Sequence, residues 1–87
     1  MKILAIKMNK EPLSTKVIYE KNGSLFIRTG ADGFTKGTPL KAPLKSALNK
    51  WGFRSVVNPP EFRDSDELID NIGKFDMASD GKIKFYE

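Results

Sequence analysis

The stretch from residue 16 to residue 29, KVIYEKNGSLFIRT, constrains the fold more than any other part of the sequence. Two runs rich in β-branched and aromatic residues flank the dipeptide Asn22-Gly23. This dipeptide favours a type I′ turn, in which both central residues take positive φ. The sequence therefore predicts a β-hairpin with a two-residue turn.

The turn sets the register of the hairpin, and the register decides which side chains share a face. The expected cross-strand pairs are Lys21 with Ser24, Glu20 with Leu25, Tyr19 with Phe26, Ile18 with Ile27 and Val17 with Arg28. One face then carries Ile18, Leu25 and Ile27, and the other carries Val17, Tyr19, Lys21, Phe26 and Arg28. Because both faces hold apolar side chains, the second face is either a binding surface or the floor of a second packed layer.

The remaining segments predict strands and helices that extend and cover this hairpin. Residues 1–8 contain an unbroken apolar run, which is typical of a central strand. An apolar stripe at helical spacing, followed by Gly52, predicts a helix over about 43–51 in which the stripe residues Leu44, Ala47, Leu48 and Trp51 belong to the core. Asp64 with Glu67 three residues later is an Asp variant of the capping box and predicts a second helix over about 65–75. Residues 54–57 and 82–86 have the pattern of short strands.

These elements predict the order β-β-β-α-β-α-β in a single compact domain over residues 1–87, since a chain of this length supports one modest core. We expect an α+β fold, a two-layer sandwich in which both helices cover one face of a four- or five-stranded mixed sheet. The last strand, helix and strand would form a β-α-β unit if the two strands are parallel.

Composition limits where the protein acts and what it binds. The sequence has no cysteine, which suits a reducing compartment and excludes disulfides and thiolate zinc sites. Lys7 breaks the first apolar run too early for a signal peptide, and no apolar stretch approaches the roughly 20 residues that span a bilayer. We therefore expect a cytoplasmic protein with no membrane partner. A single small core also leaves little room for a small-molecule substrate or a cofactor, and we expect neither.

The absence of histidine as well as cysteine removes the commonest general base and the thiol nucleophile. We expect no catalytic residues and therefore no enzyme. Carboxylates gathered near residue 64 resemble a magnesium site only superficially, because acidic side chains in a first turn cap free amides and complement the helix dipole. We expect capping here and no metal site.

The basic residues are unevenly distributed along the sequence. The net charge is +4, but residues 1–54 carry eleven basic and three acidic side chains, a balance of +8. Residues 55–87 carry four basic and eight acidic side chains, a balance of −4. Such an asymmetry indicates a polyanionic partner if the two halves stay apart in the fold.

Two groups of residues are candidates for binding that partner. In the hairpin, the opposed rings of Tyr19 and Phe26 lie on one face with Lys21 and Arg28, a combination that stacks bases and contacts phosphates. The alternative is a cross-strand aromatic pair that packs under another element. The second group lies around the first helix, where Lys41 and Lys45 form a cationic strip beside Lys36, with Lys50 and Arg54 nearby. The alternative is an ordinary solvated helix face.

Two functions remain open at this point. The first is a small, non-catalytic, basic protein that binds nucleic acid through a cationic and aromatic surface. The second is an inhibitor or adaptor, of the kind that phages and mobile elements encode, that docks on an acidic surface of a larger protein. The sequence favours the first because the basic residues are accompanied by aromatic ones.

Overall fold

The computed structural model describes residues 1–8, 15–29 and 38–86, and within them the predicted hairpin is present. Strands β2 (Lys16–Lys21) and β3 (Ser24–Thr29) are antiparallel, and the expected register holds from the pair Lys21–Ser24 to the pair Val17–Arg28. Asn22 and Gly23 have φ values of 53° and 81°, as a type I′ turn requires. The local prediction is therefore confirmed residue by residue.

The described residues form a sheet of seven strands in the order β4-β3-β2-β1-β5-β7-β6. The central strand β1 (Lys2–Lys7) lies between β2 and β5 (Arg54–Val57), antiparallel to both. Strand β7 (Ile83–Phe85) is parallel to β5, so the two strands meet the condition on which the predicted β-α-β unit depends. The sheet is therefore mixed, as predicted.

The predicted number of strands and order of elements are wrong, because the sheet contains two short strands that the sequence pattern does not show. Strand β4 (Thr38–Pro39) adds to β3, and strand β6 (Phe75–Met77) adds to β7. The order among the described residues is β-β-β-β-α-β-α-β-β, with a 3₁₀ turn at Ile72–Lys74 after the second helix. Strands of two or three residues are too short to display the alternation that identifies a strand.

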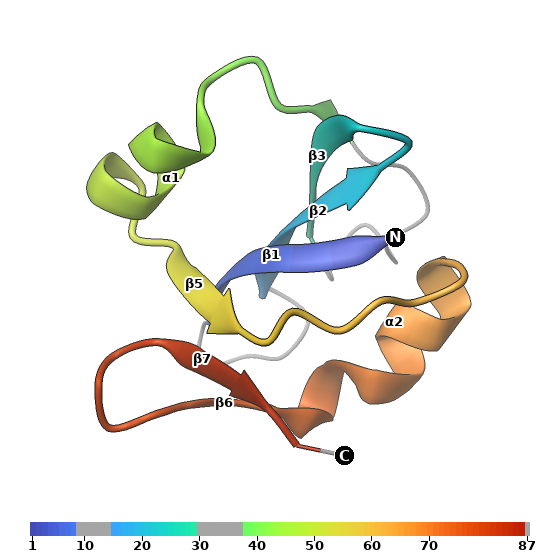
Figure 1. Ribbon diagram of the computed structural model, residues 1–87, viewed down its shortest axis with the longest axis vertical. Helices are drawn as coiled ribbons and strands as arrows, with labels where there is room; N and C mark the ends of the chain where they lie inside the picture. Colours follow the sequence, from blue (N-terminus) through green and yellow to red (C-terminus); the bar gives the residue numbers. More distant parts are fainter. Residues whose placement is uncertain (9–14, 30–37, 87) are drawn as a thin grey trace.

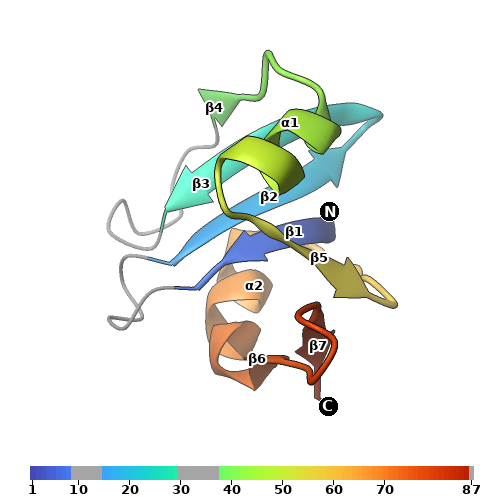
Figure 2. The same ribbon diagram turned by 90° about the vertical axis from the view of Figure 1, so that its left-hand side faces the viewer.

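The two helices cover opposite faces of the sheet, so the fold has three layers where a two-layer sandwich was expected (Figure 1, Figure 2). Helix α1 (Leu44–Lys50) packs on a cluster formed by Ala5, Ile18, Ala47 and Phe53. Helix α2 (Ser65–Asn71) packs on the larger cluster, formed by Ile3, Ile6, Val17, Tyr19, Val56, Phe62, Leu68, Phe75 and Ile83. Side chains that alternate along β1 and β2 supply both clusters, and alternating side chains point to opposite faces.

An irregularity in β1 adapts the central strand to both layers. The register with β2 shifts between Ile3, which faces Tyr19, and Ala5, which faces Ile18. This bulge puts Ile3 and Ile6 in the α2-side cluster and leaves Ala5 in the α1-side cluster. Ile3, Ala5 and Ile6 are fully buried, which confirms the prediction of a central strand.

The helix ends follow the sequence signals. Gly52 has a φ of 77° directly after α1, and the amide of Phe53 then donates to the carbonyl of Ala47 at 3.3 Å. At the start of α2, the amide of Glu67 donates to Oδ1 of Asp64 at 3.0 Å, which confirms the predicted cap. Helix α2 ends at Asn71, four residues earlier than expected, because the chain tightens into the 3₁₀ turn and Phe75 begins β6. Neither described helix is long and apolar enough to cross a bilayer.

Candidate nucleic-acid interface

The aromatic pair of the hairpin forms as predicted, but it lies inside the protein. The rings of Tyr19 and Phe26 are stacked with their centroids 5.4 Å apart and their planes 19° apart. Tyr19 is 2% exposed and belongs to the α2-side core, and Phe26 packs against the same cluster. The guanidinium of Arg28 lies over the Tyr19 ring, 4.9 Å from its centroid. The second face of the hairpin is therefore the floor of a packed layer, and Tyr19 offers no free ring to a base.

The remaining predicted residues are dispersed. Lys21 is exposed at the end of β2, beside the hairpin turn. Lys41 and Lys45 are both exposed on the α1 side, but Lys41 precedes the helix, so the two do not form one helical row. Lys36 lies outside the described residues. Of the predicted binding cations that the structure describes, Lys45 lies in α1 and Lys41 lies just before it.

Helix α1 presents a cationic outer face. Its inner face consists of the buried Ala47 with the half-buried Leu44 and Leu48, and Lys45, Asn49 and Lys50 are exposed. The helix sequence, LKSALNK, contains no acidic residue. The outer face of α1 is therefore positively charged along its length.

The fold adds two lysines to this face that sequence reasoning did not select. Lys7 and Lys16 end β1 and start β2, and they are directly opposite each other in the register. The Cε and Nζ atoms of Lys7 lie 3.7 and 3.9 Å from the position that a Cβ on Gly52 would occupy, at the end of α1. Like charges directly across a strand pair are destabilising, so packing alone does not favour this arrangement. Only the register of β1 against β2 brings the two residues together, which is why no local signal identifies them.

We define the cationic surface as Lys7, Lys16, Lys41, Lys45 and Lys50. Arg54, which the sequence places near the first helix, has its guanidinium beside Gly81 instead, 3.6 Å from the position of a Cβ there. The one ion pair within the described residues is far from this surface in sequence, between Arg63 Nε and Glu67 Oε2 at 3.2 Å. None of the five lysines takes part in that ion pair.

The helix on the other side of the sheet is acidic. Helix α2, SDELIDN, contains no basic residue, and it covers the face opposite α1 (Figure 1). The two helices on opposite faces of the sheet therefore differ in charge, with α1 basic and α2 acidic. Other charges do not follow this division, because Arg28 from the basic half lies over Tyr19 of the α2-side cluster and Asp80 from the acidic half lines a pocket with Leu48 of α1.

The carboxylates of α2 have local hydrogen-bonding roles. Asp64 caps the helix, and Glu67 Oε2 accepts from the backbone amide and Nε of Arg63 at 2.9 and 3.2 Å. These bonds, the backbone bond first and the side-chain bond second, lower the pKa of Glu67 from its ordinary value of 4.5. No group of three metal-ligating side chains occurs in the part of the chain that the structure describes.

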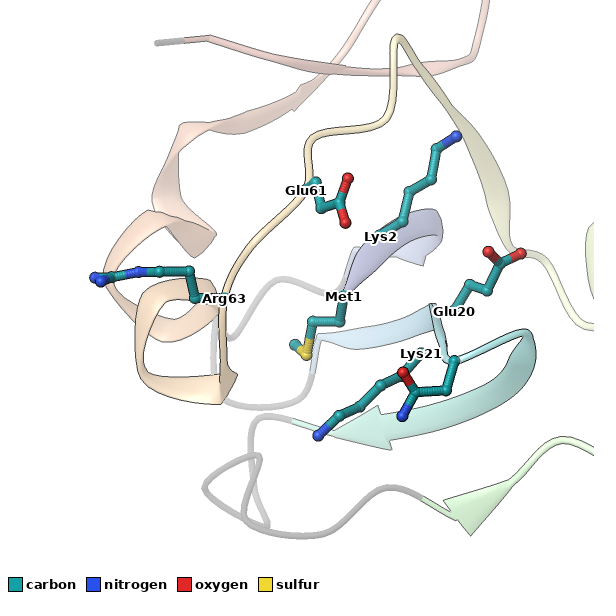
Figure 3. A pocket seen from close by; sticks show the side chains of 7 residues that line it. Met1, Lys2, Glu20, Lys21, Glu61 and Arg63 are labelled. Atoms are coloured by element: carbon teal, nitrogen blue, oxygen red, sulfur yellow. The ribbon is translucent and has the colours of Figure 1, made fainter.

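A groove of about 450 Å³ lies between the hairpin turn and the N-terminal end of β1 (Figure 3). Its charged lining residues are Lys2, Glu20, Lys21, Glu61 and Arg63. The charged ends of Lys2, Lys21 and Arg63 point in different directions, so they do not converge on one ligand (Figure 3). The mixed charges and the divergent side chains make this groove a poorer candidate than the cationic surface.

An exposed tryptophan ends α1. The sequence stripe predicted Trp51 to be a core residue, but it is 41% exposed at the C-terminal cap of the helix. The helix stops at Lys50, and Trp51 follows as its C-cap residue. It supplies the exposed aromatic group that the hairpin does not.

Comparison with protein-family models, with curated proteins and with solved structures gave no match to this chain.

Proposed function

We propose that this protein binds nucleic acid without catalysing a reaction on it, and that the cationic surface contacts the phosphate backbone. The observation that carries the proposal is the difference in charge between the two helices on opposite faces of the sheet, with α1 basic and α2 acidic. A phosphate backbone is a continuous row of negative charges, and binding to it depends on lysines and arginines spread over a surface. Five lysines from three separate segments provide such a surface.

The proposal replaces the hairpin platform with the α1 side of the molecule. Tyr19, Phe26 and Arg28 stabilise the hairpin and its packing against α2, while Lys41 and Lys45 remain phosphate contacts. Lys7, Lys16 and Lys50 join them. Lys21 lies at the hairpin turn and contributes at most a peripheral charge.

The test is a comparison of two charge-matched double variants. Lys45→Ala with Lys50→Ala removes two charges from the cationic surface, and Lys74→Ala with Lys82→Ala removes two exposed charges from the C-terminal half. Fluorescence anisotropy with labelled single-stranded and duplex oligonucleotides, from 25 to 300 mM salt, measures both affinity and salt dependence. We expect the first variant to bind more weakly and to lower the slope of log K against log salt by about 0.7 to 0.9 for each lost phosphate contact.

The second variant is expected to bind like the wild type. Equal losses in both variants would show that only the net charge matters and would contradict an interface on α1. Absence of binding to every oligonucleotide at low salt would contradict the function itself.

An acidic surface of a protein partner is the second candidate, because the same charge separation suits it. Addition of a partner strand to the hairpin is less favourable than the sequence suggests, since β4 already pairs with Phe26 and Ile27 of β3. Copurification of one stoichiometric protein that resists nuclease treatment and moderate salt would favour this candidate over nucleic acid.

A further inference from the structure

Trp51 is the only tryptophan in the sequence, and its surroundings distinguish it from the other exposed apolar side chains. Among the described residues, Met8, Met77 and Tyr86 are also large, apolar and exposed. The Lys84 ammonium lies 5.4 Å from the centroid of the Tyr86 ring, so this ring already has a cation as partner. Trp51 belongs to neither of the two described core clusters.

The backbone turn after α1 brings Trp51 close to two lysines. Lys50 is the last residue of the helix and is exposed. Gly52, with a φ of 77°, redirects the chain immediately after Trp51, and the end of the Lys7 side chain lies against it. Trp51 therefore follows one lysine along the chain and precedes a glycine against which the end of a second lysine lies.

The position of the two lysines near the end of α1 has a structural explanation, but the presence of an indole beside them does not. Cations near a helix C-terminus interact favourably with the helix dipole, which accounts for Lys50 and Lys7. A single exposed apolar side chain is common on protein surfaces. The combination of an exposed aromatic ring with nearby cations is, however, the pattern by which proteins hold single-stranded nucleic acid, with bases stacked on the ring and phosphates beside the charges.

We infer that Trp51 stacks on an unpaired base of single-stranded nucleic acid while Lys7 and Lys50 contact the adjoining phosphates. This inference rests on the proposed function and specifies its ligand. Bases in a duplex are stacked on each other and present only their edges in the grooves, so a duplex has no interior ring face for Trp51. The protein is therefore expected to prefer single strands to duplexes of equal length.

The intrinsic fluorescence of Trp51 can be used to measure binding at this site, because no other tryptophan contributes to the fluorescence. The full chain is titrated with a 12-nucleotide oligothymidylate, a 12-nucleotide oligouridylate and a 12-base-pair duplex. We expect both single strands to quench the fluorescence of Trp51 on saturation and the duplex to change it much less. Anisotropy of labelled oligonucleotides then compares Trp51→Ala, Trp51→Phe and the control Tyr86→Ala, after circular dichroism has shown that each variant is folded.

The expected result is a loss of roughly tenfold or more in single-strand affinity for Trp51→Ala. Trp51→Phe should recover part of this loss because it retains a ring, and Tyr86→Ala should bind like the wild type. Unchanged affinity of Trp51→Ala, or equal binding of single strands and duplex without quenching, would overturn the inference while the proposed function stands. If none of the three oligonucleotides bound at low salt, the proposed function would fall together with it.

Discussion

At the scale of single residues, the hairpin turn shows how a backbone conformation restricts which residue types can occupy two positions. Asn22 and Gly23 both have positive φ, and no heavy atom lies within 4 Å of the position that a Cβ on Gly23 would occupy. Steric crowding with neighbouring residues therefore does not require the glycine. The requirement is the left-handed backbone itself, which costs other residues about 1 to 2 kcal/mol.

Gly23→Ala should consequently reduce the free energy of unfolding by about 1 kcal/mol. Gly73→Ala is the matched control, because Gly73 also has open space at its Cβ position but has no positive φ. This control is expected to be neutral or slightly stabilising, since alanine restricts the unfolded chain. Urea unfolding measures both variants, and an equal loss in the two would contradict the conformational explanation.

Tyr19 shows that the type of a residue does not predict whether its side chain is exposed to solvent. Its ring, its partner Phe26 and the nearby Arg28 have the composition of a base-stacking platform. Their positions on the hairpin are those predicted from the register. Their face is nevertheless covered, and Tyr19 is part of the α2-side core. Conversely, Trp51 ends a helical apolar stripe and is exposed, because the helix terminates one residue before it.

At the scale of elements, the N-terminus of α2 is stabilised by charge as well as by hydrogen bonds. Asp64 caps the helix, as predicted from its spacing to Glu67. Glu67 reaches back one residue further than in a standard capping box and accepts from the amide and side chain of Arg63. The charged form of Glu67 is therefore favoured in the folded state, and its pKa is lowered.

This shift gives stability a pH dependence of known sign. The folded pKa of Glu67 lies below 4.5, so its contribution is fully present above that pH and is lost as the pH falls through the folded value. Glu67→Gln should therefore be less stable than the wild type at pH 7, and the difference should shrink as the pH falls below 4.5. Urea unfolding between pH 7 and pH 3 measures this.

The control for that experiment is Asp70→Asn, which removes an exposed charge near the other end of the same helix. We expect it to change the free energy of unfolding little at pH 7. If the difference in free energy of unfolding between Glu67→Gln and the wild type stayed constant down to pH 3, the hydrogen-bond geometry and not the charge of Glu67 would be responsible for it.

At the scale of the whole molecule, one sheet carries two cores. Neighbouring residues of β1 and β2 supply both clusters, so neither helix packs on a surface that belongs to it alone. The sheet is also continuous from β4 to β6 through β1 and β5. Loss of one layer should therefore destabilise the other.

Leu68→Ala tests this coupling. Leu68 is fully buried in the α2-side cluster, and its truncation should cost about 2 to 5 kcal/mol. Trp51 is on the opposite side of the sheet, at the end of α1. If the two layers unfold together, the denaturation midpoints from Trp51 fluorescence and from far-UV circular dichroism should coincide and fall together. A fluorescence midpoint that kept its wild-type value would show two independent units.

The sequence by itself determined the features that depend on neighbours along the chain. These are the turn at Asn22-Gly23, the hairpin register, the cap at Asp64 and the left-handed end of α1 at Gly52. Each results from steric or hydrogen-bonding preferences within a few residues. Periodicity also predicted correctly which hairpin side chains share a face, because side chains alternate strictly along a strand.

Only the tertiary structure decided what covers each face. An apolar stripe on a helix specifies that the helix packs, but it contains no information about which side of a sheet receives it. The placement of α1 and α2 on opposite faces buried Tyr19, put a basic and an acidic helix on opposite sides of the sheet, and brought Lys7 to the end of α1. The proposed interface results from these long-range contacts, and local preferences do not encode them.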